Sequence, residues 1–346
     1  MGPSVTMRTV AAEAARQAEE LEASGELREA IEVLTRANRV EPTATLELAL
    51  VRLRREAARR QTATTIVVRE PILAAQTADG VFEIDAADLT VAAIRAGMAQ
   101  SGCVLVRGLV ATDRAQRMAS GIDTAIAAFD NAAAGGTGDP GWYSPESIPD
   151  RVGEGLPDGA RRRFLRERGG LLAVDSPHML FELFELVDEV RIGSLMSDFL
   201  GERPLLSALK CTLRRVPPDL VVPGGWHQDG AFLGDRVGAF NVWLSLSRCG
   251  RDAPGLDLVP RRIDRVLASD DEATYDWSLS DRAVLAAAEG MPIVRPDFEP
   301  GDALLFDQLL VHRTAVSPTM TRERHAIEAW FFAPSAYPEG QLPILY

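Results

Sequence analysis

The C-terminal half of the chain is divided into short apolar runs, and this division limits the folds open to it. Beyond residue 205, β-branched and apolar stretches alternate with turns that contain Pro or Gly. Several short strands with such punctuation are typical of a β-sandwich or a jelly roll. We therefore predict a jelly-roll core with strands at 205–216, 239–247, 255–259, 302–306 and 326–332.

The N-terminal part has a different character. Residues 8–60 are rich in Ala, Glu, Leu and Arg, which favours helices. Small residues on either side of Gly25, followed by Pro42, resemble one tetratricopeptide (TPR) unit, and a plain helical hairpin is the alternative interpretation. One and a half repeats cannot bury their own apolar face. We expect this segment to pack on the rest of the chain or on another subunit.

A polar stretch at 61–65 marks the predicted boundary between the helical segment and a domain at 66–346. Within that domain, residues 131–170 are rich in Gly, Pro and Arg and predict a long loop or lid. The other expected features are a strand at 103–108, a helix at 115–129, an amphipathic helix at 179–200 and a polar, partly helical insertion at 261–290.

Five arginines are clustered within the expected loop. Two interpretations fit such a cluster: recognition of an anionic group on a substrate, or a solvated helix face. All but one of the 37 basic residues of the chain are arginines, so a local excess of Arg carries little information, and we favour the solvated face. The five residues are Arg161, Arg162, Arg163, Arg166 and Arg168.

Charge and cysteine content exclude several classes of protein. Asp and Glu number 50 against 37 Lys and Arg, and the resulting charge of −13 argues against nucleic acid or an anionic membrane surface as a partner. The three cysteines form no C-x-x-C pair and no disulfide framework. The sequence contains no apolar run of membrane-spanning length and no secretory signal. A cytoplasmic location is therefore expected.

The sharpest local feature is a Gly-flanked His-x-Asp sequence. His227 and Asp229 are two residues apart, so in a strand their side chains point to the same side. A turn, an apolar run and then His312 follow much later. A second imidazole on another strand completes two histidines and one carboxylate, which is the facial triad of non-haem Fe(II) oxygenases. We predict that these three residues are catalytic metal ligands.

Basic residues near this motif suggest where a carboxylate binds. Arg324 opens the strand after His312, and a guanidinium can hold a carboxylate with two parallel hydrogen bonds. Arg322 is two residues away and shares the same predicted face, so the two can exchange roles. Lys210 is the single lysine of the chain, and it alternates with Thr212 and Arg214 along the strand that precedes the triad. Its predicted role is to bind a carboxylate of the co-substrate or substrate, and the alternative is a surface lysine.

From residue 82 to 346 the sequence resembles the phytanoyl-CoA dioxygenase (PhyH)-like family of Fe(II)/2-oxoglutarate oxygenases. The resemblance depends on the motifs Trp226-His227-Gln228-Asp229, Asn241-Val242-Trp243, Pro300-Gly301-Asp302, His312-Arg313-Thr314 and Arg324-x-Ala326-Ile327. It implies an α+β fold with a double-stranded β-helix core, flanked here by helices and by the TPR-like hairpin. It also implies Fe(II), 2-oxoglutarate and O2 as cofactor and co-substrates.

The resemblance further implies roles for individual residues. His227, Asp229 and His312 correspond to the metal triad, and Arg324 corresponds to the arginine that pairs with the C5 carboxylate of 2-oxoglutarate. Thr314 and Trp243 match a hydroxyl and an aromatic position close to the co-substrate, and Thr212 is added as a contact from the strand of Lys210. Three aromatics near the triad suit a site that excludes water, although each is also explained by core packing: Trp226, Phe232 and Trp243.

The reaction expected from this set is hydroxylation of a small molecule, with decarboxylation of 2-oxoglutarate to succinate. Asp229 occupies the position that is a small residue in the related halogenases, so halogenation is not expected. Two alternatives stay open: a TPR-type interaction protein with a vestigial oxygenase core, and an oxygenase that acts on a carrier-bound substrate. The N-terminal helices are candidates for binding a partner protein or a second copy of the chain.

Overall fold

The computed structural model describes residues 9–61, 72, 80–146, 158–220 and 225–346. Its N-terminal segment consists of three helices where the composition predicts them. The side chains of Thr9 and Thr43 accept hydrogen bonds at the starts of the first and third helices. Gly25 adopts a left-handed conformation at the turn between the first two. The helices are α1 (Val10–Ser24), α2 (Leu27–Val40) and α3 (Ala44–Arg60).

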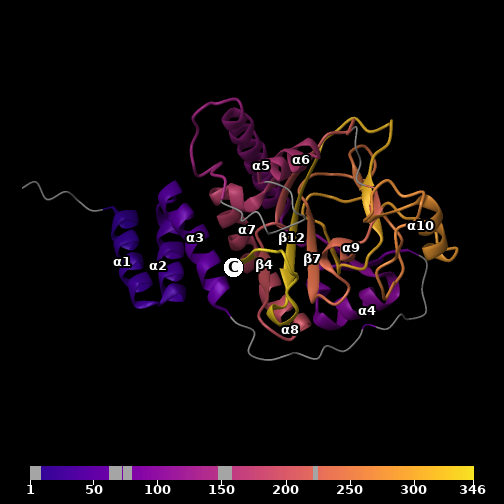
Figure 1. The fold of residues 1–346 in the computed structure, drawn as a ribbon, viewed down its shortest axis with the longest axis horizontal. Helices are drawn as coiled ribbons and strands as arrows, with labels where there is room; N and C mark the ends of the chain where they lie inside the picture. Colours follow the sequence, from indigo (N-terminus) through magenta and orange to yellow (C-terminus); the bar gives the residue numbers. More distant parts are fainter. Residues whose placement is uncertain (1–8, 62–71, 73–79, 147–157, 221–224) are drawn as a thin grey trace, which may run out of the picture.

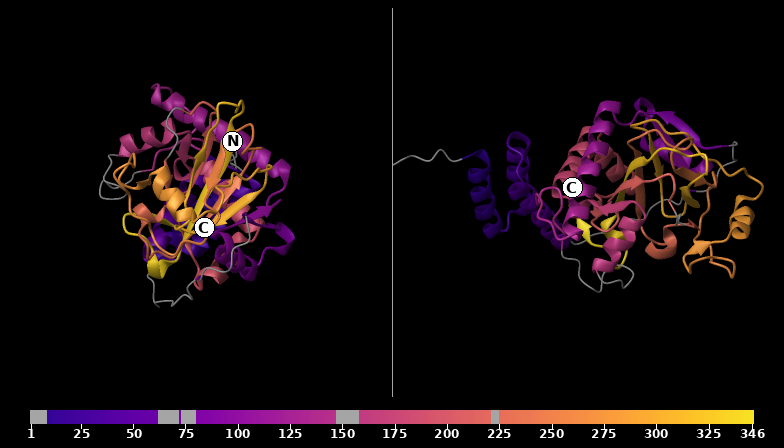
Figure 2. Two further views of the ribbon diagram at one scale, coloured as in Figure 1. Left: turned by 90° about the vertical axis from the view of Figure 1, so that its right-hand side faces the viewer. Right: turned by 90° about the horizontal axis from the view of Figure 1, so that it is seen from above.

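The helical segment packs on the body of the protein through α3, as Figures 1 and 2 show. Leu46, Leu50 and Leu53 of α3 belong to one buried cluster with Phe181 and Leu345 of the body. This contact satisfies the expectation that the apolar face of the hairpin is covered by another part of the chain. The interpretation of the hairpin as a TPR-like unit stays a prediction.

Two sheets form the body. Among the described residues, nine strands make the larger sheet: β1 (Phe82–Asp85), β2 (Cys103–Arg107), β3 (Gly170–Leu172), β4 (Leu205–Ser207), β5 (Thr212–Val216), β7 (Ala239–Ser245), β10 (Ala303–Phe306), β12 (Arg324–Phe332) and β13 (Pro343–Ile344). Four strands of the same described part make the smaller sheet: β6 (Trp226–His227), β8 (Gly255–Leu258), β9 (Ser278–Leu279) and β11 (His312–Ala315). This is the double-stranded β-helix core, and the predicted fold class is confirmed.

The central strand β7 shows how the larger sheet separates two cores. Every residue of β7 is buried, and successive side chains point to opposite faces. Val242 and Leu244 belong to the cluster under the flanking helices, whereas Trp243 belongs to the cluster between the sheets. The flanking and connecting helices are α4 (Val91–Ser101), α5 (Thr112–Ala133), α6 (Asp158–Glu167), α7 (Pro177–Glu189), α8 (Ile192–Leu200), α9 (Gly230–Leu233) and α10 (Asp281–Ala288).

Three expected elements need correction. The predicted loop at 131–170 contains helix α6, and it ends where β3 begins; residues 147–157 of this range lie outside the described part. The predicted helix at 179–200 is two helices, because Arg191 takes a left-handed conformation that a continuous helix does not allow. The predicted strand at 205–216 is two strands, β4 and β5, separated by a turn.

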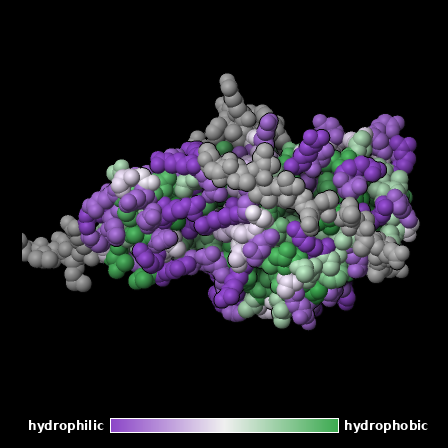
Figure 3. All heavy atoms as spheres, turned by 90° about the horizontal axis from the view of Figure 1, so that it is seen from below, coloured by the Kyte–Doolittle hydropathy of each residue, from purple (hydrophilic) through white to green (hydrophobic). Residues whose placement is uncertain are grey.

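Hydrophilic residues are spread over the face seen in Figure 3, with hydrophobic patches between them. None of the helices in the described ranges is both long enough and apolar enough to cross a membrane.

Candidate active site

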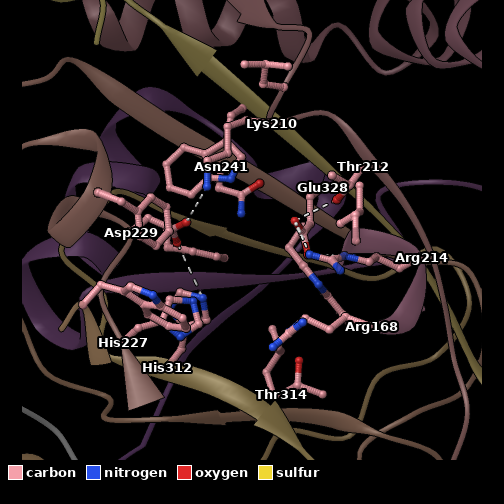
Figure 4. A pocket seen from close by; sticks show the side chains of 18 of the residues that line it. Arg168, Lys210, Thr212, Arg214, His227, Asp229, Asn241, His312, Thr314 and Glu328 are labelled. Carbon is pink, nitrogen blue, oxygen red and sulfur yellow. Dashed lines mark hydrogen bonds and ion pairs between the residues drawn. The ribbon is translucent and has the colours of Figure 1, made fainter. Parts of the chain in front are cut away.

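The two histidines of the predicted triad lie opposite each other on neighbouring strands. His227 ends β6 and His312 begins β11, and the two residues are partners in this antiparallel pair. Their ring centroids are 4.4 Å apart. Asp229 follows β6 directly, at the residue before α9, and its Oδ2 is 3.6 Å from Nε2 of His312. One ligand atom from each of the three residues lies within 4.8 Å of the other two, and Figure 4 shows the three side chains converging.

Backbone carbonyls hold both imidazoles in one tautomer. Nδ1 of His227 is 2.8 Å from the carbonyl oxygen of Gly225, and Nδ1 of His312 is 3.0 Å from that of Leu310. A carbonyl oxygen only accepts hydrogen bonds, so each Nδ1 carries the proton and donates it. The lone pair of each Nε2 is then free to bind a metal. Burial, followed by the neighbouring His312, lowers the pKa of His227 to about 4, which keeps this imidazole neutral.

Gln228, between the two ligands of the motif, points the other way and fixes the segment. Its buried Nε2 donates to the carbonyl oxygen of Leu309 at 2.6 Å, and its Oε1 accepts from the backbone N–H of Leu267 at 2.7 Å. The adjacent Gly230 passes so close to Gln308 that a Cβ there would lie 3.1 Å from the Gln308 carbonyl oxygen. Gln228 and Gly230 thus fix His227 relative to the segment that precedes β11. Sequence reasoning missed this role.

Lys210 reaches the triad from the turn before β5 rather than from the strand, so its predicted alternation with Thr212 is wrong in detail. The extended run stops at Ser207 and resumes at Thr212. The Lys210 ammonium group nevertheless lies 3.6 Å from Oδ1 of Asp229 and 3.8 Å from the ring centroid of Phe232. The single lysine is therefore next to the predicted metal ligand.

Of the two candidate arginines, Arg324 is the one inside the protein. It is 2% exposed, its Nη1 donates to the carbonyl oxygen of Gly255 at 2.9 Å, and its Cζ is 5.5 Å from the Trp243 ring. Its Nε has no hydrogen-bond partner among the described residues. Burial lowers the pKa of Arg324 to about 10, so the side chain stays charged at neutral pH. The Arg322 side chain is 66% exposed and faces Asp252 at 3.6 Å.

A second polar group lies across the cavity from the triad. Glu328 of β12 accepts hydrogen bonds from Thr212 at 2.8 Å and from Nε of Arg214 at 2.9 Å, both from the neighbouring β5 (Figure 4). Burial opposes ionisation of this carboxyl, but Arg214 and the two hydrogen bonds outweigh it and lower the pKa of Glu328 to about 2. The hydroxyl of Thr212 was predicted to contact the co-substrate. In the structure it donates its hydrogen bond to Glu328 instead.

The triad, Lys210, Arg324 and the Glu328 group line one cavity of about 240 Å³. It contains every predicted site residue: His227, Asp229, His312, Arg324, Thr314, Trp243, Lys210 and Thr212. Arg168, from the predicted arginine cluster, also lines the cavity. Sequence reasoning did not assign a further part of the wall to the site: Phe164, Leu165, Leu209, Leu220, Asn241, Leu256, Trp277, Phe306, Glu328 and Trp330.

The predicted aromatic lining is only partly correct. Phe232 and Trp243 line the cavity, whereas Trp226 packs under Arg313 and donates to Asp281 at 3.1 Å. Successive residues of a strand face opposite sides, so Trp226 points away from the side that His227 faces. By the same rule Asn241 shares the face of Trp243, and this alternation is the signal that could have identified it.

A double-stranded β-helix with two imidazoles and one carboxylate on one side of an internal cavity defines a class, the non-haem iron oxygenases. The profile of the phytanoyl-CoA dioxygenase (PhyH) family matches residues 98–325, well over half of the chain. The chain belongs to this family.

Among the similar solved structures, that of EctD supports the same fold. The crystal structure of EctD from S. alaskensis with 2-oxoglutarate and 5-hydroxyectoine has a TM-score of 0.52 at 16% identity, over 82% of this chain and 88% of that chain. The epimerase SnoN in complex with Fe3+, alpha ketoglutarate and nogalamycin RO has a TM-score of 0.45 at 16% identity, over 70% of this chain and 83% of that chain. AviO1 from Streptomyces viridochromogenes Tue57 has a TM-score of 0.42 at 18% identity, over 72% and 98%. No curated protein matches the sequence.

Proposed function

We propose that the protein is an Fe(II)/2-oxoglutarate-dependent dioxygenase that hydroxylates a small molecule. The observation that carries the proposal is the convergence of His227, Asp229 and His312, with both Nδ1 atoms donating to backbone carbonyls. Two neutral imidazoles and one carboxylate form the donor set of an Fe(II) site with open positions for further ligands. The residues present therefore fit this metal. Membership of the family supports the same conclusion.

The cavity also offers groups that suit 2-oxoglutarate. Arg324 is buried, charged and short of one hydrogen-bond acceptor at Nε, which suits the far carboxylate of the co-substrate. Thr314 and Trp243 line the cavity with it, and Lys210 lies at the metal end beside Asp229. When bound, iron and 2-oxoglutarate supply O2 activation coupled to decarboxylation of the co-substrate to succinate. The chain's own part is to hold the two reactants and to exclude water with Phe232, Trp243 and Trp277.

Asp229 bears on the type of reaction. Its carboxylate occupies the ligand position that a halide needs in the related halogenases, and Lys210 holds it from the other side at 3.6 Å. The carboxylate at this position favours hydroxylation over halogenation. EctD, whose crystal structure contains 5-hydroxyectoine, supports a small-molecule product.

An anaerobic titration of the protein with Fe(II) and 2-oxoglutarate tests the proposal. We expect a weak metal-to-ligand charge-transfer band in the visible that saturates at one equivalent of each, and succinate formation when O2 is admitted. If stoichiometric Fe(II) and 2-oxoglutarate produce neither the band nor succinate, the protein is not such an enzyme.

A further inference from the structure

The cavity contains more positive than negative side chains, and they are not all paired. The two acidic groups each have a basic neighbour: Asp229 is 3.6 Å from Lys210, and Glu328 is 2.9 Å from Arg214. Two guanidinium groups are left without a carboxylate partner among the described residues: those of Arg168 and Arg324.

Arg168 differs from the other arginines of its cluster. Arg162 is buried against Asp175, with Nε 2.6 Å from Oδ2, and Arg166 pairs with Asp130 at 2.7 Å. These two ion pairs attach α6 to the body. Arg163 is exposed on the same helix. The solvated-face interpretation therefore fits Arg163 but not the buried Arg162, whereas Arg168 lines the cavity.

The Arg168 guanidinium, one residue beyond the end of α6, contacts the last turn of that helix. Its Cζ lies 3.6 Å from the ring centroid of Phe164, and its Nη1 lies 3.5 Å from the carbonyl oxygen of the same residue, in the last turn of α6. A cation is favoured at a helix C-terminus. Figure 4 shows Arg168 on the side of the cavity away from His227 and Asp229. A preorganised guanidinium on a cavity wall is well suited to bind an oxyanion.

The sum of the charges in the filled cavity indicates the charge of the substrate. This step rests on the proposed function. Fe(II) with Asp229 and the C1 carboxylate of 2-oxoglutarate is neutral, and the C5 carboxylate neutralises one guanidinium. Whichever of Arg168 and Arg324 takes that carboxylate, the other guanidinium and Lys210 leave the filled cavity positive. Uncompensated charge is costly to the extent that it is buried, and here Arg168 is half-buried and the Lys210 side chain is 20% exposed. Arg324 is the more buried of the two and is the arginine that corresponds to the co-substrate contact, so Arg168 is the group left over.

We propose that the substrate is an organic anion, and that Arg168 binds its carboxylate or a similar oxyanion. The surrounding wall is apolar and aromatic, which suits an apolar body next to the anionic group. The residues that provide this wall are Phe164, Leu165, Leu209, Leu220 and Trp277.

Matched pairs of probes test the assignment. The binding of 4-phenylbutanoate and of 4-phenylbutanamide to the anaerobic Fe(II)/2-oxoglutarate-loaded protein is followed by tryptophan fluorescence, because Trp243 and Trp277 line the cavity. We expect the carboxylate to bind at least tenfold more tightly than the amide, and Arg168→Gln to abolish that preference. Arg163→Gln, on the exposed part of the same helix, should keep it. Equal binding of the two probes to the wild type, or a preference that survives Arg168→Gln, overturns the proposal.

A parallel titration separates this proposal from its two rivals. Arg168→Gln should change the 2-oxoglutarate concentration that half-saturates the charge-transfer band by less than twofold; a tenfold increase means that Arg168 binds the co-substrate, and the proposal is overturned. If no band forms even in the wild type, the proposed function fails. Probe binding to protein without added iron and 2-oxoglutarate then still reports whether Arg168 selects the carboxylate over the amide.

Discussion

His227 and His312 are direct partners in the antiparallel pairing of β6 with β11, and their rings lie 4.4 Å apart. This register brings two imidazoles that are distant in sequence to one point, and Asp229 reaches it from the residue that follows the strand by two. Each histidine also donates from Nδ1 to a carbonyl two residues before it. The backbone thus sets both the position and the tautomer of the predicted ligands.

Replacing Asp229 with Ala should remove both iron binding and turnover. We expect the Fe(II) affinity to fall by at least about 100-fold, because partners that only hydrogen-bond the ligands of a metal are already worth roughly 10–100-fold. Succinate formation should be lost in the same variant. Metal binding is measured by anaerobic titration, with Asp235→Ala, at an exposed aspartate nearby, as the matched control. Wild-type iron affinity in Asp229→Ala would falsify the triad assignment.

Arg324→Met should weaken 2-oxoglutarate binding while iron binding is retained. Charge-assisted hydrogen bonds contribute about 1.5–3 kcal/mol each, so we expect a loss of about 10- to 100-fold in co-substrate affinity. Arg322→Met removes an exposed guanidinium two residues away and should leave this affinity unchanged. The readout is the 2-oxoglutarate dependence of the charge-transfer band in both variants. Equal effects of the two substitutions would contradict the role of Arg324.

Two Arg–Glu pairs that join β5 and its neighbouring β12 segment differ in burial and should differ in energy. Arg214–Glu328 faces the cavity, whereas the side chains of Arg215 and Glu323 are 38% and 40% exposed. Glu328→Gln should reduce the free energy of unfolding by about 2–3 kcal/mol at pH 7, at or just below the range for breaking a buried pair. Glu323→Gln should cost about 1 kcal/mol at most. Urea denaturation measures both.

The same comparison has a defined pH dependence. The pKa of Glu328 is about 2 in the folded protein and near 4.5 ordinarily, so its ionised form stabilises the fold above pH 4.5. That contribution decreases as the pH falls through 4.5 toward 2. The stability difference between wild type and Glu328→Gln should therefore shrink between pH 5 and pH 3. A difference that stays constant over this range would show that the carboxylate charge is not the stabilising feature.

The contact between the helical segment and the body should respond to pH near neutrality. His178 of α7 lies 2.8 Å from a carboxylate oxygen of the buried Glu47 of α3, and this hydrogen bond raises the pKa of His178 above 6.5. The contribution of the pair is complete below pH 6.5 and is lost as the pH rises through the folded-state pKa. Between pH 6 and pH 8, the wild type should lose more stability than His178→Gln.

The Arg39–Glu185 pair provides the control for this effect. It joins α2 to α7 at 2.6 Å and contains no group that titrates between pH 6 and pH 8. Glu185→Gln should therefore lower the thermal midpoint by the same amount at both pH values. If His178→Gln behaves in the same way, protonation of His178 does not link the two parts.

Local sequence patterns were sufficient to predict the helices and strands that depend on composition and on nearby Gly or Pro residues. Composition, with Gly25 and Pro42 as breaks, predicted the helical segment at 8–60, and Pro and Gly punctuation predicted the strands of the core. The break at Arg191 escaped prediction because the residue in the left-handed conformation is an arginine and not a glycine. Helix α6 was not predicted, because the residues around it are rich in Gly and Pro and favoured a loop.

The sequence was sufficient to predict the residue types of the site. A His-x-Asp motif, a later His and an arginine on the following strand form a combination that is more specific than any one of them alone. The tertiary structure alone decided three features: the pairing of Arg214 with Glu328, the hydrogen bond from Gln228 to Leu309, and the position of Arg168. Each depends on which strands and helices become neighbours, and a contact between segments far apart in the chain leaves no periodic signal in either one. Burial likewise separated Arg324 from Arg322, because only the packed sheets determine which of two similar side chains faces the interior.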